Sequence, residues 1–213
     1  MKKNCLCLVI STTLLTLITN VCMAKSPISL IQGDPLILLQ ANKKAIYEID
    51  YSQMIVTDGK EENDMDFYSW METQDEDDNQ WVKDWEQKDK KECDKAFREN
   101  FNDEVKKGIR LTKLGKDYKV TFRIKKINFS VFALGGLWGQ TKAIASGEMT
   151  VSDFNTGETL LMLGFDAISG EASYKQISRL KGIFENFGEE LNEYLQDYQK
   201  SYKKAQKKAA KNK

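Results

Sequence analysis

The acidic stretch of this chain contains the residues best spaced to bind a metal ion. They occupy positions one, three, five and twelve of a calcium loop of the EF-hand type: Asp75, Asp77, Asn79 and Glu86. This spacing can wrap oxygen ligands around Ca²⁺. Two residues depart from the pattern, because Gln80 stands where a sharp turn requires glycine and Lys83 stands where an oxygen or a water coordinates. The alternative, which we favour, is that Asp75 to Asp78 place negative charge at a helix N-terminus, where the helix dipole stabilises it.

Most other catalytic chemistry is excluded by composition. The chain contains no histidine, which removes His-dependent triads, imidazole general bases and imidazole zinc sites. Three of the four cysteines, Cys5, Cys7 and Cys22, lie in the first 24 residues, so Cys93 is the one thiol beyond them. Free cysteines are usually buried as small apolar side chains, and we expect this of Cys93. The sequence therefore predicts a protein that is not an enzyme and has no cofactor, with calcium as the alternative.

The first 24 residues have the pattern of a secretory signal peptide. Lys2 and Lys3 precede an apolar run from Cys5 to Ile18, and Cys22-Met23-Ala24 supplies an ending that signal peptidase accepts. We expect cleavage after Ala24, a periplasmic or secreted location and no transmembrane span in the mature chain. The alternative is that Cys22 is retained as a lipid anchor.

Length and charge predict one domain without a strong global field. Removing 24 of the 213 residues leaves 189, enough for a single well-packed core. The 32 basic and 32 acidic residues cancel, so nothing directs the whole chain to nucleic acid. We expect an arm over residues 25–44, a domain over 45–198 and a Lys-rich tail over 199–213 that frays into solvent.

Alternating apolar residues predict a β-sheet. Strands are expected where every second residue is apolar: Ala45 to Val56, Tyr118 to Val131, Ala143 to Phe154 and Leu161 to Phe165. A phase change at Lys125-Lys126 predicts a β-bulge, and Asn155-Thr156-Gly157 predicts a tight turn. The last three strands follow one another without a helix, which predicts an antiparallel meander. The segment around Leu36 to Leu39 is either an edge strand or an arm over the core.

Two amphipathic helices are expected to cover this sheet. The first runs from Gln80 through Val105, with Gly108 as its C-cap, and the second steps from Ile177 to Leu195 by three and four residues. Gly182 and Gly188 predict either a break in the second helix or a close approach to the sheet. The acidic segment 58–79 is expected to be an exposed, mobile loop, although its aromatic residues dock on the domain or on a partner. The fold class is therefore α+β, with helices on one face of a mostly antiparallel sheet.

A glycine-rich hairpin is the leading candidate for a partner-binding site. Large apolar residues gather at its tip: Phe132, Leu134, Leu137 and Trp138. An apolar tip of this kind either inserts into a partner or folds back onto the core. The lysines beyond Tyr198 either bind an anionic surface, screen the acidic loop of the same or another chain, or simply increase solubility.

The order of elements, the hairpin from Phe132 to Gly139 and the stretch from Gly147 to Glu158 together resemble a family of bacterial envelope proteins, often lipoproteins. Those domains are similar in layout to the N-terminal domain of TolB and to the periplasmic domain of the curli secretion pore subunit. The resemblance covers roughly Ala45 to Leu195 and implies a binding or assembly role in the envelope, with no catalytic residues to carry over.

We therefore expect a non-enzymatic secreted or periplasmic protein that binds another envelope protein or an outer-membrane component. The alternative is a calcium-binding secreted protein that uses the segment from Asp75 to Glu86.

Overall fold

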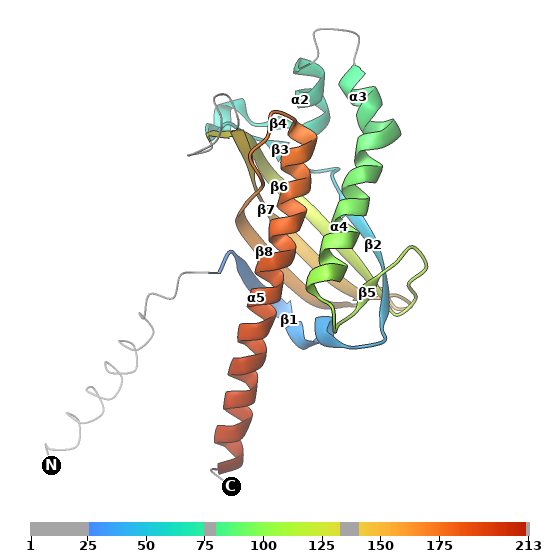
Figure 1. Ribbon diagram of the computed structural model, residues 1–213, viewed down its shortest axis with the longest axis vertical. Helices are drawn as coiled ribbons and strands as arrows, with labels where there is room; N and C mark the ends of the chain where they lie inside the picture. The colour runs from blue at the N-terminus through green and yellow to red at the C-terminus, as the bar shows by residue number, and fades with distance from the viewer. Residues whose placement is uncertain (1–25, 75–79, 133–140, 212–213) are drawn as a thin grey trace, which may run out of the picture.

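The computed structural model describes residues 26–74, 80–132 and 141–211. Its sheet is mixed and mostly antiparallel, with the order β1-β8-β7-β6-β2-β5, and β3 and β4 extend it beside β6 (Figure 1). The strands are β1 (Ile28–Gly33), β2 (Lys44–Asp50), β3 (Ile55–Val56), β4 (Met65–Asp66), β5 (Arg110–Leu111), β6 (Tyr118–Phe132), β7 (Thr141–Asp153) and β8 (Thr159–Ser169). The predicted meander is β6-β7-β8, and β2 joins it parallel to β6.

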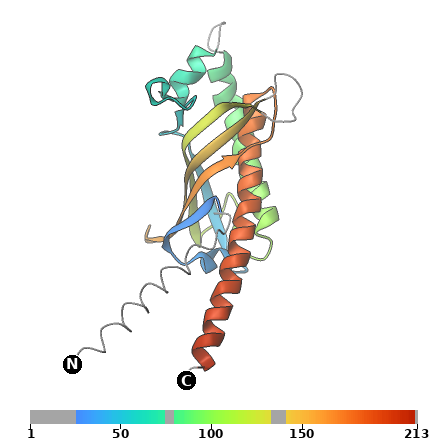
Figure 2. The same ribbon diagram turned by 90° about the vertical axis from the view of Figure 1, so that its left-hand side faces the viewer.

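Helices cover one face of this sheet, which confirms the predicted α+β class. The helical elements are η2 (Pro35–Leu39), η3 (Glu61–Asn63), α2 (Phe67–Thr73), α3 (Gln80–Asp84), the π-helical η4 (Trp85–Asp89), α4 (Lys90–Glu104) and α5 (Gln176–Lys211). α4 and α5 lie side by side on the same face, and Figure 2 shows both of them on one side of the sheet. Within the described ranges, no helix combines the length and apolar character needed to cross a membrane.

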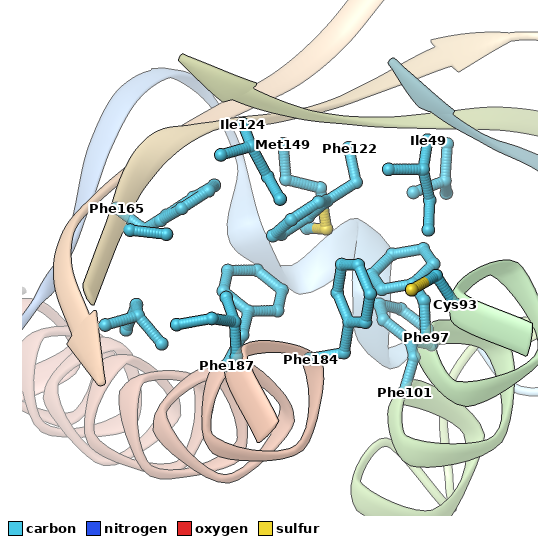
Figure 3. Packing of buried hydrophobic residues seen from close by; sticks show 14 of the residues in the cluster. Ile49, Cys93, Phe97, Phe101, Phe122, Ile124, Met149, Phe165, Phe184 and Phe187 are labelled. Atoms are coloured by element: carbon cyan, nitrogen blue, oxygen red, sulfur yellow. The ribbon is translucent and has the colours of Figure 1, made fainter. Parts of the chain in front are cut away.

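Stacked and edge-on aromatic rings join the sheet to both helices. The ring of Phe122 on β6 lies 4.9 Å from that of Phe97 on α4 and 4.7 Å from that of Phe187 on α5. It also stacks on Phe165 of β8 at 4.8 Å (Figure 3). Phe122 is fully buried, so its single side chain contacts β8, which lies one strand beyond β7, and both covering helices.

Cys93 lies in this core, as the sequence predicts. Its side chain on α4 is fully buried, and burial raises the pKa of the thiol far above its usual range. A thiol held in this state is a packing group, since the thiolate is the reactive form.

Ion pairs cover the centre of the opposite face. Arg123 on β6 donates to Asp50 Oδ2 at 2.7 Å and to Glu148 Oε1 at 3.0 Å, and Lys125 Nζ lies 2.5 Å from Glu148 Oε2. Asp153, by contrast, accepts from the backbone N–H groups of the β7–β8 turn. The carboxylates of Glu148 and Asp153 therefore contact different groups, Glu148 in ion pairs and Asp153 in a turn, and they do not form a pair with each other.

The predicted bulge and turn are both present. The β6–β7 register shifts between Ile124 and Lys126, and Gly157 closes the β7–β8 turn with a positive φ of 73°, which glycine adopts without strain.

The N-terminal region is more regular than the predicted arm. β1 pairs antiparallel with β8 and forms one edge of the sheet, a strand that the sequence analysis missed. All of its residues except Ile28 are exposed, so it lacks the apolar alternation that reveals a half-buried strand. The segment from Leu36 to Leu39 is not an edge strand, because it belongs to the turn η2, whose Leu38 is fully buried.

The prediction of a mobile loop is also wrong for the described part of the acidic segment. Residues 58–74 form η3, the strand β4 paired with β3, and α2. Phe67 and Met71 of α2 are buried, so the aromatic residues dock on the domain itself. This docking stabilises α2. The high net charge of the segment therefore did not predict its structure.

Helix ends differ from the sequence expectation for identifiable reasons. The helix expected from Gln80 contains the π-helical turn η4, and α4 ends at Glu104 with Val105 as its C-cap. Gly108 is not the cap. A Cβ on Gly108 would lie 1.9 Å from the carbonyl oxygen of Leu38, so glycine permits the close approach of η2.

The glycines of α5 do not break the helix. A Cβ on Gly182 would lie 2.4 Å from the backbone nitrogen of Glu171, and one on Gly188 would lie 3.3 Å from Glu104 Cγ on α4. The close approaches are therefore to the β8–α5 connection and to α4 rather than to the sheet. The predicted fraying beyond Tyr198 is also wrong, because α5 continues as a helix to Lys211.

We predict that Phe122→Ala lowers the free energy of unfolding by about 3–5 kcal/mol, because it leaves a cavity where the sheet meets both α4 and α5. Urea denaturation followed by circular dichroism measures the change. Phe154→Ala is the matched control, since Phe154 is 43% exposed and its loss should cost less than about 0.5 kcal/mol. Equal losses in the two variants would contradict the central role of Phe122.

Candidate partner-binding end

The residues predicted from sequence to form sites fall mainly outside the described ranges. Asp75, Asp77 and Asn79 of the calcium pattern lie there, as do Leu134, Leu137 and Trp138 of the hairpin tip. Phe132 ends β6, where its backbone is paired with Thr141, and its side chain is not described. Glu86 lies in η4. The described residues that flank both segments nevertheless define where each segment is attached.

Those flanks lie at one end of the molecule. α2 precedes the undescribed acidic residues and α3 follows them, while β6 and β7 flank the hairpin tip (Figure 1). The ring of Trp70 on α2 stacks on Phe129 near the end of β6 at 4.8 Å, with an interplanar angle of 6°. Trp70 also meets Trp81 of α3 edge-on at 5.2 Å. This aromatic contact fixes the attachment points of the acidic segment and of the hairpin side by side.

A second aromatic layer lies beneath this contact. Phe67 meets Trp85 of η4 edge-on at 4.9 Å, and Trp85 meets Tyr51 at the same distance. All three side chains are buried, and burial, with a smaller contribution from Cys93, raises the pKa of Tyr51 well above its ordinary value. A rigid apolar base of this kind holds α2 and α3 in place against β6.

Arg179 secures the same end from the side of α5. Its guanidinium donates to the carbonyl oxygens of Ser173 at 2.7 Å, Tyr174 at 3.1 Å and Phe129. The side chain is only 8% exposed, and burial lowers its pKa. The sequence gives no sign of this role of Arg179, since an arginine in an amphipathic helix carries no signal that distinguishes burial from exposure.

Exposed carboxylates surround the aromatic base. They are held by local contacts: Asp58 accepts from Asn63 Nδ2 at 2.8 Å, Asp66 caps α2 by accepting from the Ser69 N–H, and Asp64 pairs with Lys126 at 2.8 Å. These hydrogen bonds lower the pKa of each carboxyl group. Together with exposed Glu61, Glu62 and Glu72, they give the end a negative charge at neutral pH.

A polar hollow beside this end has balanced charge. It measures about 520 Å³, in the range of small-molecule sites, and its lining includes Trp81, Asp89, Glu92 and Lys181. Lys181 pairs with Glu92 and lowers the pKa of that carboxyl, whereas burial raises the pKa of Asp89. Because acids and lysines neutralise one another here, the hollow presents no excess charge to a ligand.

The described part of the calcium pattern is engaged elsewhere. Glu86 Oε1 accepts from the Tyr68 hydroxyl at 2.8 Å, and no group of three carboxylate or thiol side chains in the described ranges is placed to hold a metal ion. The expected helix start is confirmed only in part, since α3 begins at Gln80 and the acids before it are not described.

No family model and no curated protein matches this sequence. Solved structures similar to this chain include PelC from Paraburkholderia phytofirmans, described as a dodecamer. One PelC structure, of a single-residue variant, is 7% identical with a TM-score of 0.37, covering 78% of this chain and 95% of that one. A second is 9% identical with the same TM-score, covering 74% and 92%. Similarity at this level carries no inference about this chain, and the resemblance to envelope proteins stays a prediction.

We predict that Arg179→Lys lowers the free energy of unfolding by about 1–3 kcal/mol, because an ammonium cannot reach three carbonyl oxygens and leaves buried acceptors unpaired. Thermal and urea denaturation measure the loss. Arg98→Lys is the control, since Arg98 pairs on the surface with neighbouring Glu99 and its replacement should change stability by less than about 0.5 kcal/mol. Equal stability of both variants would contradict the anchoring role of Arg179.

We also predict that titration with Ca²⁺ produces no binding heat at millimolar metal. Gln80 replaces the turn glycine, Lys83 replaces a ligand, and Glu86 is already hydrogen-bonded to Tyr68. Isothermal calorimetry checks this on the wild type and on Glu86→Gln. A saturable heat that Glu86→Gln abolishes would establish the calcium alternative instead.

Proposed function

We propose that this chain is a non-enzymatic binding or assembly protein of the bacterial cell envelope, and that it contacts its partner through the end formed by α2, α3 and the tips of β6 and β7. The observation that carries the proposal is the stacking of Trp70 on Phe129. It brings together the attachment points of the acidic segment and of the apolar hairpin, the two segments whose composition favours partner contact.

A binding role fits the chemistry of the described carboxylates. Glu148, Asp50 and Asp64 are tied in ion pairs, and Asp66 and Asp153 cap backbone N–H groups. Groups held in such pairs maintain the fold and are poor general acids or bases near neutral pH. With no histidine in the chain, binding is the better-supported function.

The chemistry of this end specifies the kind of partner. Exposed carboxylates on an aromatic base favour a partner protein that presents basic side chains around an apolar groove, because complementary charge guides encounter and excludes wrong partners. The apolar residues Leu137 and Trp138 would occupy that groove. The envelope location rests on the leader pattern of residues 1–24.

Site-specific photo-crosslinking tests the proposal in cells. A benzophenone amino acid replaces Leu137 or Trp138, and Leu114 is the matched control because it is 85% exposed in the β5–β6 connection. We expect a discrete crosslinked product with an envelope protein from positions 137 and 138 and none from 114. The charge reversal Glu61→Lys with Glu62→Lys should reduce the crosslink yield several-fold, because it removes the attraction for a basic partner.

Two outcomes would contradict this function. Crosslinks of equal yield from positions 114 and 137 would indicate nonspecific contact, and no crosslink from any position would indicate that this end meets no protein. Circular dichroism of the charge-reversal variant confirms that its fold is unchanged.

A further inference from the structure

The C-terminal part of α5 projects from the domain. Leu195 is the last buried residue of the helix, which continues to Lys211 with every residue from Lys200 onward exposed. Figures 1 and 2 both show this part extending past the sheet and α4. The twelve residues from Lys200 to Lys211 thus lie beyond the core of their own domain.

The solvent face of α5 changes sign of charge along its length. An α-helix turns by about 100° per residue, so residues that fall within an arc of about 140° share one face. On this face lie five acidic residues followed by six lysines: Glu185, Glu189, Glu190, Glu193, Asp197, then Lys200, Lys203, Lys204, Lys207, Lys208 and Lys211. The apolar residues that enter the core, such as Phe184 and Leu191, lie on the opposite face.

Four acids in the first half of the face and four lysines in the second half are mirror images in spacing. The midpoint of the pattern falls between Tyr198 and Gln199. Four of the five acids have a lysine at the same separation on the other side of that midpoint: Asp197 with Lys200, Glu193 with Lys204, Glu190 with Lys207 and Glu189 with Lys208. A second α5 laid antiparallel across the midpoint would place each of these four acids opposite a lysine.

We propose that two copies of this chain associate through the solvent faces of their α5 helices, antiparallel about a two-fold axis between Tyr198 and Gln199. Such an interface is isologous, so every acid–lysine contact occurs twice. The paired region from Glu189 to Lys208 is about 30 Å long. The core lies behind each helix, so it does not intervene between the two charged faces.

Within one copy, each half of the face repels itself. Like charges three and four residues apart destabilise a helix, and this spacing recurs among Glu189, Glu190 and Glu193 and among the lysines. Burial, together with the neighbouring Glu193 and Glu189, raises the pKa of Glu190. Close to the axis, Asp197 and Lys200 of the same helix already form an ion pair at 2.9 Å, so their charges are balanced within one copy. Antiparallel pairing replaces repulsion in both halves by attraction.

A second copy fits this face better than an anionic lipid surface does. A bilayer would attract the six lysines and repel the adjacent carboxylates of Glu189, Glu193 and Asp197 on the same face. The second copy matches both halves at once. It also uses a surface separate from the end formed by α2, α3, β6 and β7, so the two proposals are independent.

Sedimentation velocity of the purified protein tests the association. We expect a dimer at about 0.02 M salt and a monomer at about 0.5 M, because exposed charge pairs are screened within a few ångströms at high ionic strength. Lys204→Glu with Lys208→Glu should weaken the dimer about 100-fold, since four attractive contacts become repulsive. Glu189→Lys with Glu193→Lys should weaken it equally.

Mixing the two double variants is the decisive step. Each variant is expected to be monomeric alone. An equimolar mixture should form a heterodimer, because each glutamate that replaces a lysine in one variant then faces a lysine that replaces a glutamate in the other. Lys91→Glu with Lys95→Glu on α4 makes the same change in net charge away from α5, and it should dimerise like the wild type. Circular dichroism confirms that each variant is folded.

Three results would overturn the proposal: a monomeric wild type at low salt, a dimer unaffected by either double variant, or no heterodimer in the mixture. Vesicles of phosphatidylglycerol and phosphatidylcholine are run in parallel. If the protein is monomeric and binds these vesicles in a manner lost in Lys204→Glu with Lys208→Glu, the lysines serve a lipid surface instead.

Discussion

The fold depends on the burial of one aromatic layer between the sheet and two helices. Phe122 contacts Phe97 of α4, Phe187 of α5 and Phe165 of β8, so it couples elements that are far apart in sequence. A sheet with one apolar face must be covered, and here each helix covers only part of it: α4 lies toward β2 and α5 toward β7 and β8. Neither helix alone would remove that face from water. The other face is stable in water because Arg123 and Lys125 neutralise Asp50 and Glu148 there.

Aromatic packing also explains how a strongly acidic segment became ordered. Carboxylates cannot be buried cheaply, so α2 buries only Phe67 and Met71 and leaves its polar residues outside. Trp70 then stacks on the ring of Phe129, and Arg179 donates a hydrogen bond to the backbone carbonyl oxygen of the same residue. Phe129 is therefore held from both sides, by α2 through its ring and by α5 through its backbone. This double contact makes the end a fixed platform for the two segments attached to it.

The periodicity of apolar residues in the sequence predicted the helices and strands that have one buried face. The strands β2, β6, β7 and β8 and the buried half of α5 all follow from alternation or from three- and four-residue steps. β1 was missed because its pairing with β8 is made by backbone groups while its side chains are exposed. The last part of α5 was missed because its helix is favoured by lysine, alanine and glutamine, not by an apolar stripe. At the candidate site, the acidic segment and hairpin were recognised separately, but the proximity of their attachment points depends on Trp70 and Phe129. Those residues are far apart in sequence, and no local pattern links them.

The two faces of α5 give one helix two separable tasks. Its apolar face completes the core, and its charged face is directed outward, so charge reversal there leaves the core contacts of Phe184 and Leu191 intact. The N-terminal part of α5 lies at the candidate partner-binding end, where Ile177 and Leu180 border Trp81 and Phe129. Antiparallel pairing about Tyr198 and Gln199 would therefore direct the two partner-binding ends away from each other, about 60 Å apart along the helix pair. A dimer of this form could hold two partners at a fixed separation, because the spacer between them is continuous helix and not a flexible linker.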